Sequence, residues 1–282
     1  MITENPMQLK AFIKKKAAEK NISAQIVLQN YMLERLLERI SLSEYRENFV
    51  LKGGYLIAAI VGLETRATMD LDTTIKGFAL THASIREIFE RICAIQVADG
   101  ITFSVVRTTD IREGNDYPGL RVRITADYPP LKVPLTMDVT TGDAITPREV
   151  EYALHLLFED RSISILAYNL ETILAEKLET VISRNVASTR PRDLYDIHML
   201  HTLRGAAYAP SVLRLALEET ARKRASLDAM PTYKKVMADI LDSPAMRRFW
   251  HGYQAEFAYA RDIPFETVCR TVVEILDRCY PA

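Results

Sequence analysis

The spacing of hydrophobic and polar positions changes twice along the chain. Near the N-terminus, apolar residues recur at helical spacing, as at Ile26, Leu33, Leu37 and Ile40. Short apolar runs bounded by glycine follow, and these predict strands. From residue 169 onwards only helical patterns remain. We therefore expect a helical lead-in, then a mixed sheet with helices, then a helical half.

The individual elements follow from the same patterns. We expect helices at 7–20, 23–40, 55–61 and 83–97, and strands at 49–51, 71–75, 101–106, 120–124, 131–140 and 162–166. Pro134 predicts that its strand bulges or lies at a sheet edge. The fold class is therefore α+β. We place the boundary near 165–170, with a sheet-containing domain at 1–168 and a helical C-terminal domain at 169–282.

Two aspartates, Asp70 and Asp72, are candidates for holding a metal ion. On a strand their spacing places both on one face, whereas Met69, Leu71 and Ile75 point the other way, toward a core. Neighbouring carboxylates repel each other, and Mg²⁺ (or Mn²⁺) removes that cost while also binding substrate phosphate oxygens. A pair of exposed acids at a strand end is the alternative, because this spacing is common.

Asp138, Gly53 and Gly54 extend the pattern. Asp138 lies in a second strand-like segment, and three carboxylates converge if the two strands are neighbours, which is enough for a two-metal site. Gly53 and Gly54 stand at a strand-to-helix junction, where backbone N–H groups can approach an anion. A plain turn is the alternative, since the Gly-Lys-Ser/Thr element of a Walker loop is missing.

Four sequence blocks, taken in order, resemble a known family. They are Leu51-Lys52-Gly53-Gly54, Arg66-x-Thr68-x-Asp70-Leu71-Asp72, Ala175-Glu176-Lys177 and Arg190-Pro191-Arg192-Asp193-Leu194-Tyr195-Asp196. Over about residues 20–205 the chain resembles the AbiEii/AbiGii toxins, including the MenT-type toxins, of the nucleotidyltransferase superfamily. The resemblance implies a polymerase-beta-like core, a nucleoside triphosphate substrate, and a toxin–antitoxin or abortive-infection role with a partner antitoxin. Some relatives transfer nucleotides onto the 3′ end of tRNA, which makes tRNA the expected acceptor.

The resemblance also assigns roles to residues. Thr68 and Asp70 match the family's hydroxyl and first acid, Lys177 its triphosphate-contacting lysine, and Asp196 its late acid. Asp70 and Asp72 would hold metal, with Asp138 as a third ligand or as a base. The expected catalytic residues are Asp70, Asp72, Asp138, Lys177 and Asp196, and the expected substrate-binding residues are Lys52, Gly53, Gly54, Arg66, Thr68, Arg192 and Asp193.

The sequence departs from the family pattern at two positions, and two of the assigned residues also have a purely structural interpretation. The superfamily's usual Gly-Ser turn is Gly54-Tyr55 here, and Thr68 stands where serine is common. Lys177, on a helix that Asn169 can cap, is by itself more often a solvated lysine. Pro191 favours a helix start, after which Arg192 and Asp196 have the spacing of an i,i+4 ion pair.

Composition limits the remaining function classes. Hydrophobic residues make up 48% and charged residues 26% of the chain, which is ordinary for a globular protein. No apolar run reaches the roughly 20 residues that span a bilayer, and no secretory signal begins the chain. Three cysteines without metal-ligand spacing indicate a cytoplasmic setting. The net charge of −1 gives no indication of a nucleic-acid partner.

Other interpretations also stay open. A phosphotransferase or a non-catalytic nucleotide-binding module would use the same pocket. Short basic clusters at 222–224, 234–235 and 247–248 are either an RNA-binding surface or solvated helix faces. The aromatic residues between Trp250 and Tyr259 have the spacing of a helical core. His198 and His201 lack a third metal ligand and are expected to be ordinary helix residues.

Overall fold

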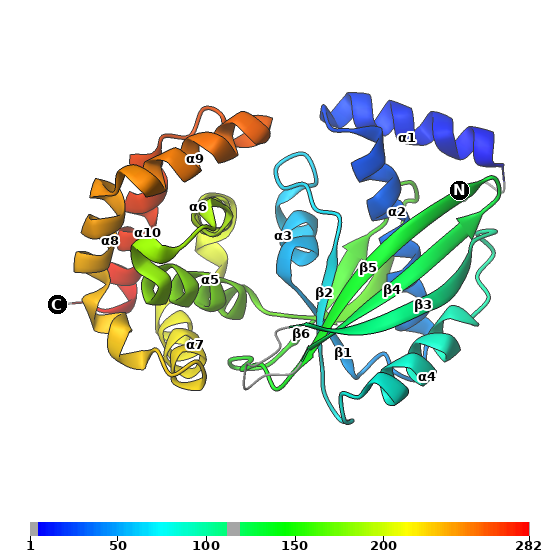
Figure 1. Cartoon of the computed structure of the whole chain (residues 1–282), viewed down its shortest axis with the longest axis horizontal. Helices are drawn as coiled ribbons and strands as arrows, with labels where there is room; N and C mark the ends of the chain where they lie inside the picture. The colour runs from blue at the N-terminus through cyan, green and yellow to red at the C-terminus, as the bar shows by residue number, and fades with distance from the viewer. Residues whose placement is uncertain (1–4, 112–118, 282) are drawn as a thin grey trace. The chain divides into compact units, whose positions relative to one another are not determined.

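A computed structural model describes residues 5–111 and 119–281 of the chain (Figure 1). The chain divides into two compact units. The first contains Met1–Asp143 and Val150–Ala167, and the second contains Ala144–Glu149 and Tyr168–Ala282. The second unit therefore begins at residue 168 and also includes a short segment that precedes the last two strands of the first. Each unit is described separately below.

The first unit is built on a mixed seven-stranded sheet. Its strands are β1 (Phe49–Lys52), β2 (Leu71–Ile75), β3 (Thr102–Ile111), β4 (Gly119–Tyr128), β5 (Leu131–Thr141), β6 (Val150–His155) and β7 (Ser162–Ala167), and their order is β3-β4-β5-β2-β1-β7-β6. β2 pairs in parallel with β5, and β1 in parallel with β7. The other neighbours are antiparallel. β6, an edge strand with mostly exposed side chains, was not predicted, although Val150, Tyr152 and Leu154 recur at every second position.

Four helices accompany this sheet: α1 (Pro6–Lys20), α2 (Ala24–Leu42), α3 (Gly53–Val61) and α4 (His82–Cys93). Helices α2 and α4 pack on one face, which presents the apolar side chains of β4 and β5. Helix α3 packs on β1 and β2 from the opposite face, and helices on both sides bury all four residues of β1. The opposite face over β3, β4 and β5 carries mostly polar side chains.

Pro134 lies at a local edge of the sheet, which is one of the two positions that the sequence predicted. β5 lies in the interior of the sheet, but its pairing with β2 begins only at Met137. Pro134 therefore lies in a stretch of β5 that pairs with β4 alone, opposite Thr125. A proline is tolerated there because this stretch is locally an edge.

The second unit consists of helices, with bounds α5 (Leu170–Arg184), α6 (Pro191–Arg204), α7 (Pro210–Lys223), α8 (Tyr233–Asp242), α9 (Pro244–Glu256) and α10 (Phe265–Cys279). The side chain of Asn169 accepts a hydrogen bond from the Thr172 N–H and caps α5, and Pro191 begins α6, both as predicted. Trp250 and Tyr253 are buried, which confirms that these aromatics form core. In the part of the chain that the structure describes, no helix is long and apolar enough to cross a membrane.

Candidate active site

A row of charged residues crosses four adjacent strands of the first unit. In the sheet register, Asp72 on β2 is the partner of both Lys52 on β1 and Asp138 on β5, and Asp138 is also the partner of Arg121 on β4. Residues paired in this way project from the same face of a sheet. The order of charges is therefore plus, minus, minus, plus, with the two carboxylates side by side in the middle.

Gly53 and Gly54 hold the first of these carboxylates. Gly53 has φ +66°, a conformation that other residues rarely adopt, and a Cβ placed on it would collide with the Asp72 carboxylate. The Gly54 N–H, in the first turn of α3, donates a hydrogen bond to that carboxylate. The glycine junction and Asp72 thus form one packed feature, in which only glycine fits at position 53.

The electrostatics of Asp72 favour a cation. Burial, and then the neighbouring Asp138, raise the pKa of Asp72, while Lys52 and the Gly54 N–H oppose that rise and Asp70 adds to it. A carboxylate that is costly to ionise beside a second carboxylate is suited to a divalent ion with oxygen ligands. The Asp72 carboxylate is therefore suited by its chemistry to Mg²⁺ or Mn²⁺.

Asp138, expected as a third metal ligand or as a base, is bound by an arginine in the structure. Both oxygens of Asp138 accept hydrogen bonds from the guanidinium of Arg121, at 2.8 Å each. Asp70 precedes β2 and is exposed. Within residues 5–111 and 119–281, no three acidic, histidine or cysteine side chains are grouped to hold a metal ion. The structure thus brings Asp72 and Asp138 together, but it does not converge Asp70 with them.

One sequence expectation about this strand was wrong. Leu71 and Ile75 are buried as predicted, but Met69 is 39% exposed. The reason is that Met69 lies ahead of the first residue of β2, so the alternation of a strand does not apply to it.

Lys52 has a partner that the sequence did not reveal. Its ammonium group lies 2.5 Å from the Asp143 carboxylate, and both side chains are largely buried. Burial alone would raise the pKa of Asp143, but Lys52 and hydrogen bonds from Thr140 and Thr74 lower it to about 2. Asp143 lies two residues after the end of β5, and an acid close to a strand end is the signal that could have identified it.

The loop before β2 is held by two amides from α2, which the sequence also did not identify. The side chain of Asn30 donates to the Thr68 carbonyl at 2.7 Å, and Gln29 donates to the Met69 carbonyl at 3.3 Å. Both amides are buried. They position the segment that carries Thr68 and Asp70, and a polar residue on the buried face of a predicted helix was the available signal.

Thr68 and Arg66 lie against Gly54. A Cβ at Gly54 would lie 3.1 Å from Thr68 Oγ1 and 3.2 Å from Arg66 Nη2. Arg66 is buried, and its guanidinium donates to the Ala67 carbonyl. These two predicted substrate-binding side chains are therefore placed at the first turn of α3, beside Asp72.

The remaining predicted residues form a cluster in the second unit. Lys177 on α5 contacts Asp193 at 2.6 Å and Asp196 at 2.8 Å, both on α6. Burial tends to lower the pKa of Lys177, but the two carboxylates outweigh it and raise that pKa. Arg192 is exposed, whereas Arg190 is the arginine that pairs with Asp193. Asp196 is thus paired with Lys177, which was not the i,i+4 partner expected from the spacing.

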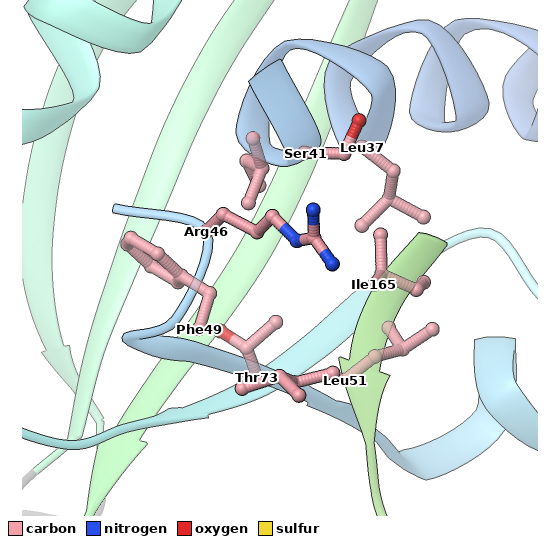
Figure 2. A pocket seen from close by; sticks show the side chains of 9 residues that line it. Leu37, Ser41, Arg46, Phe49, Leu51, Thr73 and Ile165 are labelled. Atoms are coloured by element: carbon pink, nitrogen blue, oxygen red, sulfur yellow. The ribbon is translucent and has the colours of Figure 1, made fainter. Parts of the chain in front are cut away.

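A small cavity lies on the other face of the sheet. Leu37, Ser41, Arg46 and Thr73 line it together with apolar residues of β1 and β7, and its volume is about 10 Å³, room for about one water molecule (Figure 2). Thr73 points away from the face that carries Asp72, because the two are consecutive in a strand. This cavity is therefore not the substrate site.

Comparison with family models identifies the family of the chain. The family model of the nucleotidyl transferase AbiEii toxin of type IV toxin–antitoxin systems matches residues 35–271. The chain belongs to this AbiEii family. Its membership makes it a nucleotidyltransferase toxin by family and implies an antitoxin partner and a nucleoside triphosphate substrate.

Solved structures show the same fold. MenT4, a nucleotidyltransferase toxin from Mycobacterium tuberculosis H37Rv, is 15% identical, with a TM-score of 0.52 over 96% of this chain and 98% of that one. A putative nucleotidyltransferase from H. pylori is also 15% identical, with a TM-score of 0.50 over 92% of this chain and 97% of its own. No match was found among curated proteins. The predicted fold class, α+β with a mixed sheet and a helical C-terminal region, is confirmed.

Proposed function

We propose that this AbiEii-family chain is a metal-dependent nucleotidyltransferase that transfers a nucleotide from a nucleoside triphosphate to RNA, with the 3′ end of tRNA as acceptor. We place it in the cytoplasm, in a toxin–antitoxin or phage-defence system. One observation carries the proposal: Gly53 and Gly54 pack against the Asp72 carboxylate, and the sheet register places Asp72 directly beside Asp138.

The reaction is an in-line displacement at the α-phosphorus. The oxygen of the acceptor's 3′-hydroxyl forms a new bond to that phosphorus, the bond to the β-phosphate oxygen breaks, and pyrophosphate leaves. The hydroxyl proton passes to Asp138 or to water. Asp70 and Asp72 would hold Mg²⁺ or Mn²⁺, which supplies charge neutralisation at the phosphates when bound.

The other side chains bind and orient substrate. The N–H groups of the first turn of α3, with Arg66 and Thr68 beside them, are suited to the negatively charged triphosphate. Lys52 stays fixed against Asp143 and keeps the glycine junction in register with Asp72. By family resemblance, Lys177 contacts the triphosphate and Asp193 and Asp196 hold that lysine.

The test follows two positions of a radioactive label. The purified chain is incubated with Mg²⁺ or Mn²⁺, total tRNA, and each triphosphate labelled at the α- or the γ-phosphate. Nucleotide transfer moves only the α-label to RNA, whereas a phosphotransferase moves only the γ-label. A non-catalytic module moves neither, although it binds the nucleotide. Absence of α-label transfer with every triphosphate, from folded protein, refutes the proposal.

A matched pair of variants checks the site. Asp72→Ala is expected to abolish α-label transfer, and omitting the divalent ion is expected to do the same. Asp110→Ala is the control, because Asp110 is an exposed aspartate on β3 that contacts His82 on the helix-covered face. The control is expected to keep full transfer, and equal loss in both variants would contradict the assignment.

A further inference from the structure

Three arginines share the polar face of the sheet next to Asp138. Arg107 on β3 pairs in register with Arg123 on β4, and Arg121 lies two residues from Arg123 on the same face. Two residues along a strand correspond to about 7 Å, and directly paired side chains lie about 5 Å apart at Cβ. The three guanidinium groups therefore form one compact basic patch, called here the β3–β4 arginine patch.

A β-bulge puts Arg107 on this face. Phe103 and Val105 pair with Ala126 and Ile124, which are buried beneath the helices, and simple alternation would send Arg107 to the same side. The register shifts between Val105 and Arg107, so Val106 is the extra residue and Arg107 meets Arg123 instead. Bulges re-aim side chains in this way and are frequent beside active sites.

Contacts of α4 confirm the shift. The His82 ring, at the start of α4, lies 2.7 Å from Thr108 Oγ1 and 3.2 Å from the Asp110 carboxylate. Thr108 and Asp110 therefore face the helix. Arg107 and Thr109, which alternate with them, face the open side of the sheet.

Two of the three patch arginines, Arg107 and Arg123, have no acidic partner within the described residues. Like charges directly opposite each other in a sheet are destabilising. The other cross-strand neighbours on this face are Thr109 opposite Arg121 and Thr136 opposite Arg123, and both are neutral. In the described part of the chain, Asp138 is bound to Arg121, and no acidic side chain pairs with Arg107 or Arg123. An external anion would remove this repulsion.

The basic clusters of the second unit, at 222–224, 234–235 and 247–248, differ from the patch because acids lie beside them. Their arginines and lysines are largely engaged by acids of the same unit, as in Arg222–Glu219, Arg224–Glu179, Lys234–Asp277 and Arg247–Glu266. A cation that already has a carboxylate partner gains less from a phosphate. Among the basic groups singled out, the β3–β4 arginine patch is therefore better suited to an outside polyanion than these clusters.

We propose that the β3–β4 arginine patch binds the phosphate backbone of the acceptor RNA close to its 3′ end. This inference rests on the proposed function. Arginine's planar fork matches phosphate oxygens, and the patch begins at Arg121, whose partner Asp138 is in register with Asp72. A strand of RNA lying along β4 from Arg123 to Arg121 brings its terminal nucleotide to the carboxylates.

The experiment measures RNA binding without any transfer step. Binding of 5′-fluorescein-labelled tRNA is followed by fluorescence anisotropy over a range of salt concentrations, without nucleotide. Arg107→Gln/Arg123→Gln is expected to weaken binding about tenfold or more and to make the slope of log K against log salt shallower by about 1.4–1.8, for two lost contacts. The control, Arg86→Gln/Arg91→Gln on the exposed face of α4, removes the same charge and is expected to bind as the wild type does.

A second variant separates binding from folding. Arg123→Glu places an acid opposite Arg107, so the melting temperature is expected to stay the same or to rise while RNA affinity falls. Unchanged affinity and slope in both patch variants would overturn the inference. So would loss of nucleotide binding with RNA binding intact, because the patch would then serve the triphosphate.

The two proposals fail in different ways. If the wild type transfers α-label and the patch variants bind RNA normally, the patch inference is wrong and the proposed function stands. If the wild type transfers nothing but the patch variants lose RNA binding, the patch is an RNA-binding surface and the proposed function is wrong.

Discussion

Gly53→Ala is the sharpest test of how the fold builds the carboxylate site. The added Cβ meets two independent penalties. Holding alanine at φ +66° costs about 1–2 kcal/mol. The Cβ would also lie 2.7 Å from both Cβ and Cγ of Asp72, well inside the roughly 3.5–4.0 Å of a good carbon contact, so Asp72 must move by about 1 Å.

Moving Asp72 has consequences for stability and activity. It weakens the charge-assisted hydrogen bond from the Gly54 N–H, worth about 1.5–3 kcal/mol. Together with the φ penalty, we expect a loss of about 3 kcal/mol, or about 6–12 °C in melting temperature. A shift of about 1 Å in a metal-binding carboxylate is expected to lower nucleotide transfer about 100-fold.

Two other glycines make the series quantitative. Gly252 lies on the exposed side of α9 with no atom within 4 Å of an added Cβ, so Gly252→Ala is expected to stabilise by about 0.5–1 kcal/mol and to leave transfer unchanged. Gly54→Ala has no positive φ and contacts near 3.1 Å, so its effects should fall between the two. Calorimetry and α-label transfer measure all three. A Gly53→Ala protein that melts and transfers like the wild type would refute the reasoning.

Three further predictions concern charged groups. Lys177→Met removes the ammonium group that pairs with two buried carboxylates, of which Asp193 keeps Arg190, so the unfolding free energy should fall by about 3–5 kcal/mol in chemical denaturation. The pKa of Asp143 is lowered to about 2 in the folded protein. Its ionised carboxylate therefore stabilises the fold fully above about pH 4, and this stabilisation is lost as the pH falls toward 2. Asp143→Asn should remove about 2 kcal/mol of this acid dependence, measured by chemical denaturation at each pH. Asp72→Asn removes a carboxylate whose pKa is raised by burial and by Asp138, so without metal the melting temperature should rise while transfer is lost.

Each of these has a contradicting outcome. Lys177→Met with wild-type stability would show that the lysine does not compensate the buried acids. An Asp143→Asn variant with the same pH profile as the wild type would mean that Lys52 does not control that titration. A lower melting temperature for Asp72→Asn would mean that its charge stabilises the fold even without a cation.

Local patterns in the sequence predicted most of the elements, although β6 was missed and the ends of β3, β4 and α4 differ from those expected. The helical and alternating periods predicted the sheet-and-helix half and the helical half, because side-chain periodicity follows from backbone geometry. Asn169 and Pro191 predicted helix starts because capping and a fixed φ act within one turn. Met69 was misplaced because strand alternation was extended beyond the actual start of β2.

The arrangement of the carboxylates depended on long-range contacts. The sequence determined that Gly53 and Gly54 precede a helix and that an acid follows on a nearby strand. Only the sheet order, with β2 between β1 and β5, set Asp72 beside Asp138 and gave Asp138 to Arg121. Strand order and register are set by packing between segments that are far apart in the chain, so no local period carries them.

The bulge at Val106 is a second feature that local sequence patterns did not predict and the tertiary structure decided. Simple alternation continued from Phe103 and Val105 would place Arg107 on the buried face. The tertiary structure moves it to the open face, because one extra residue in β3 reverses every side chain that follows. The sequence by itself thus determined which residues have the chemistry for phosphate and metal, and the tertiary structure decided which of them meet.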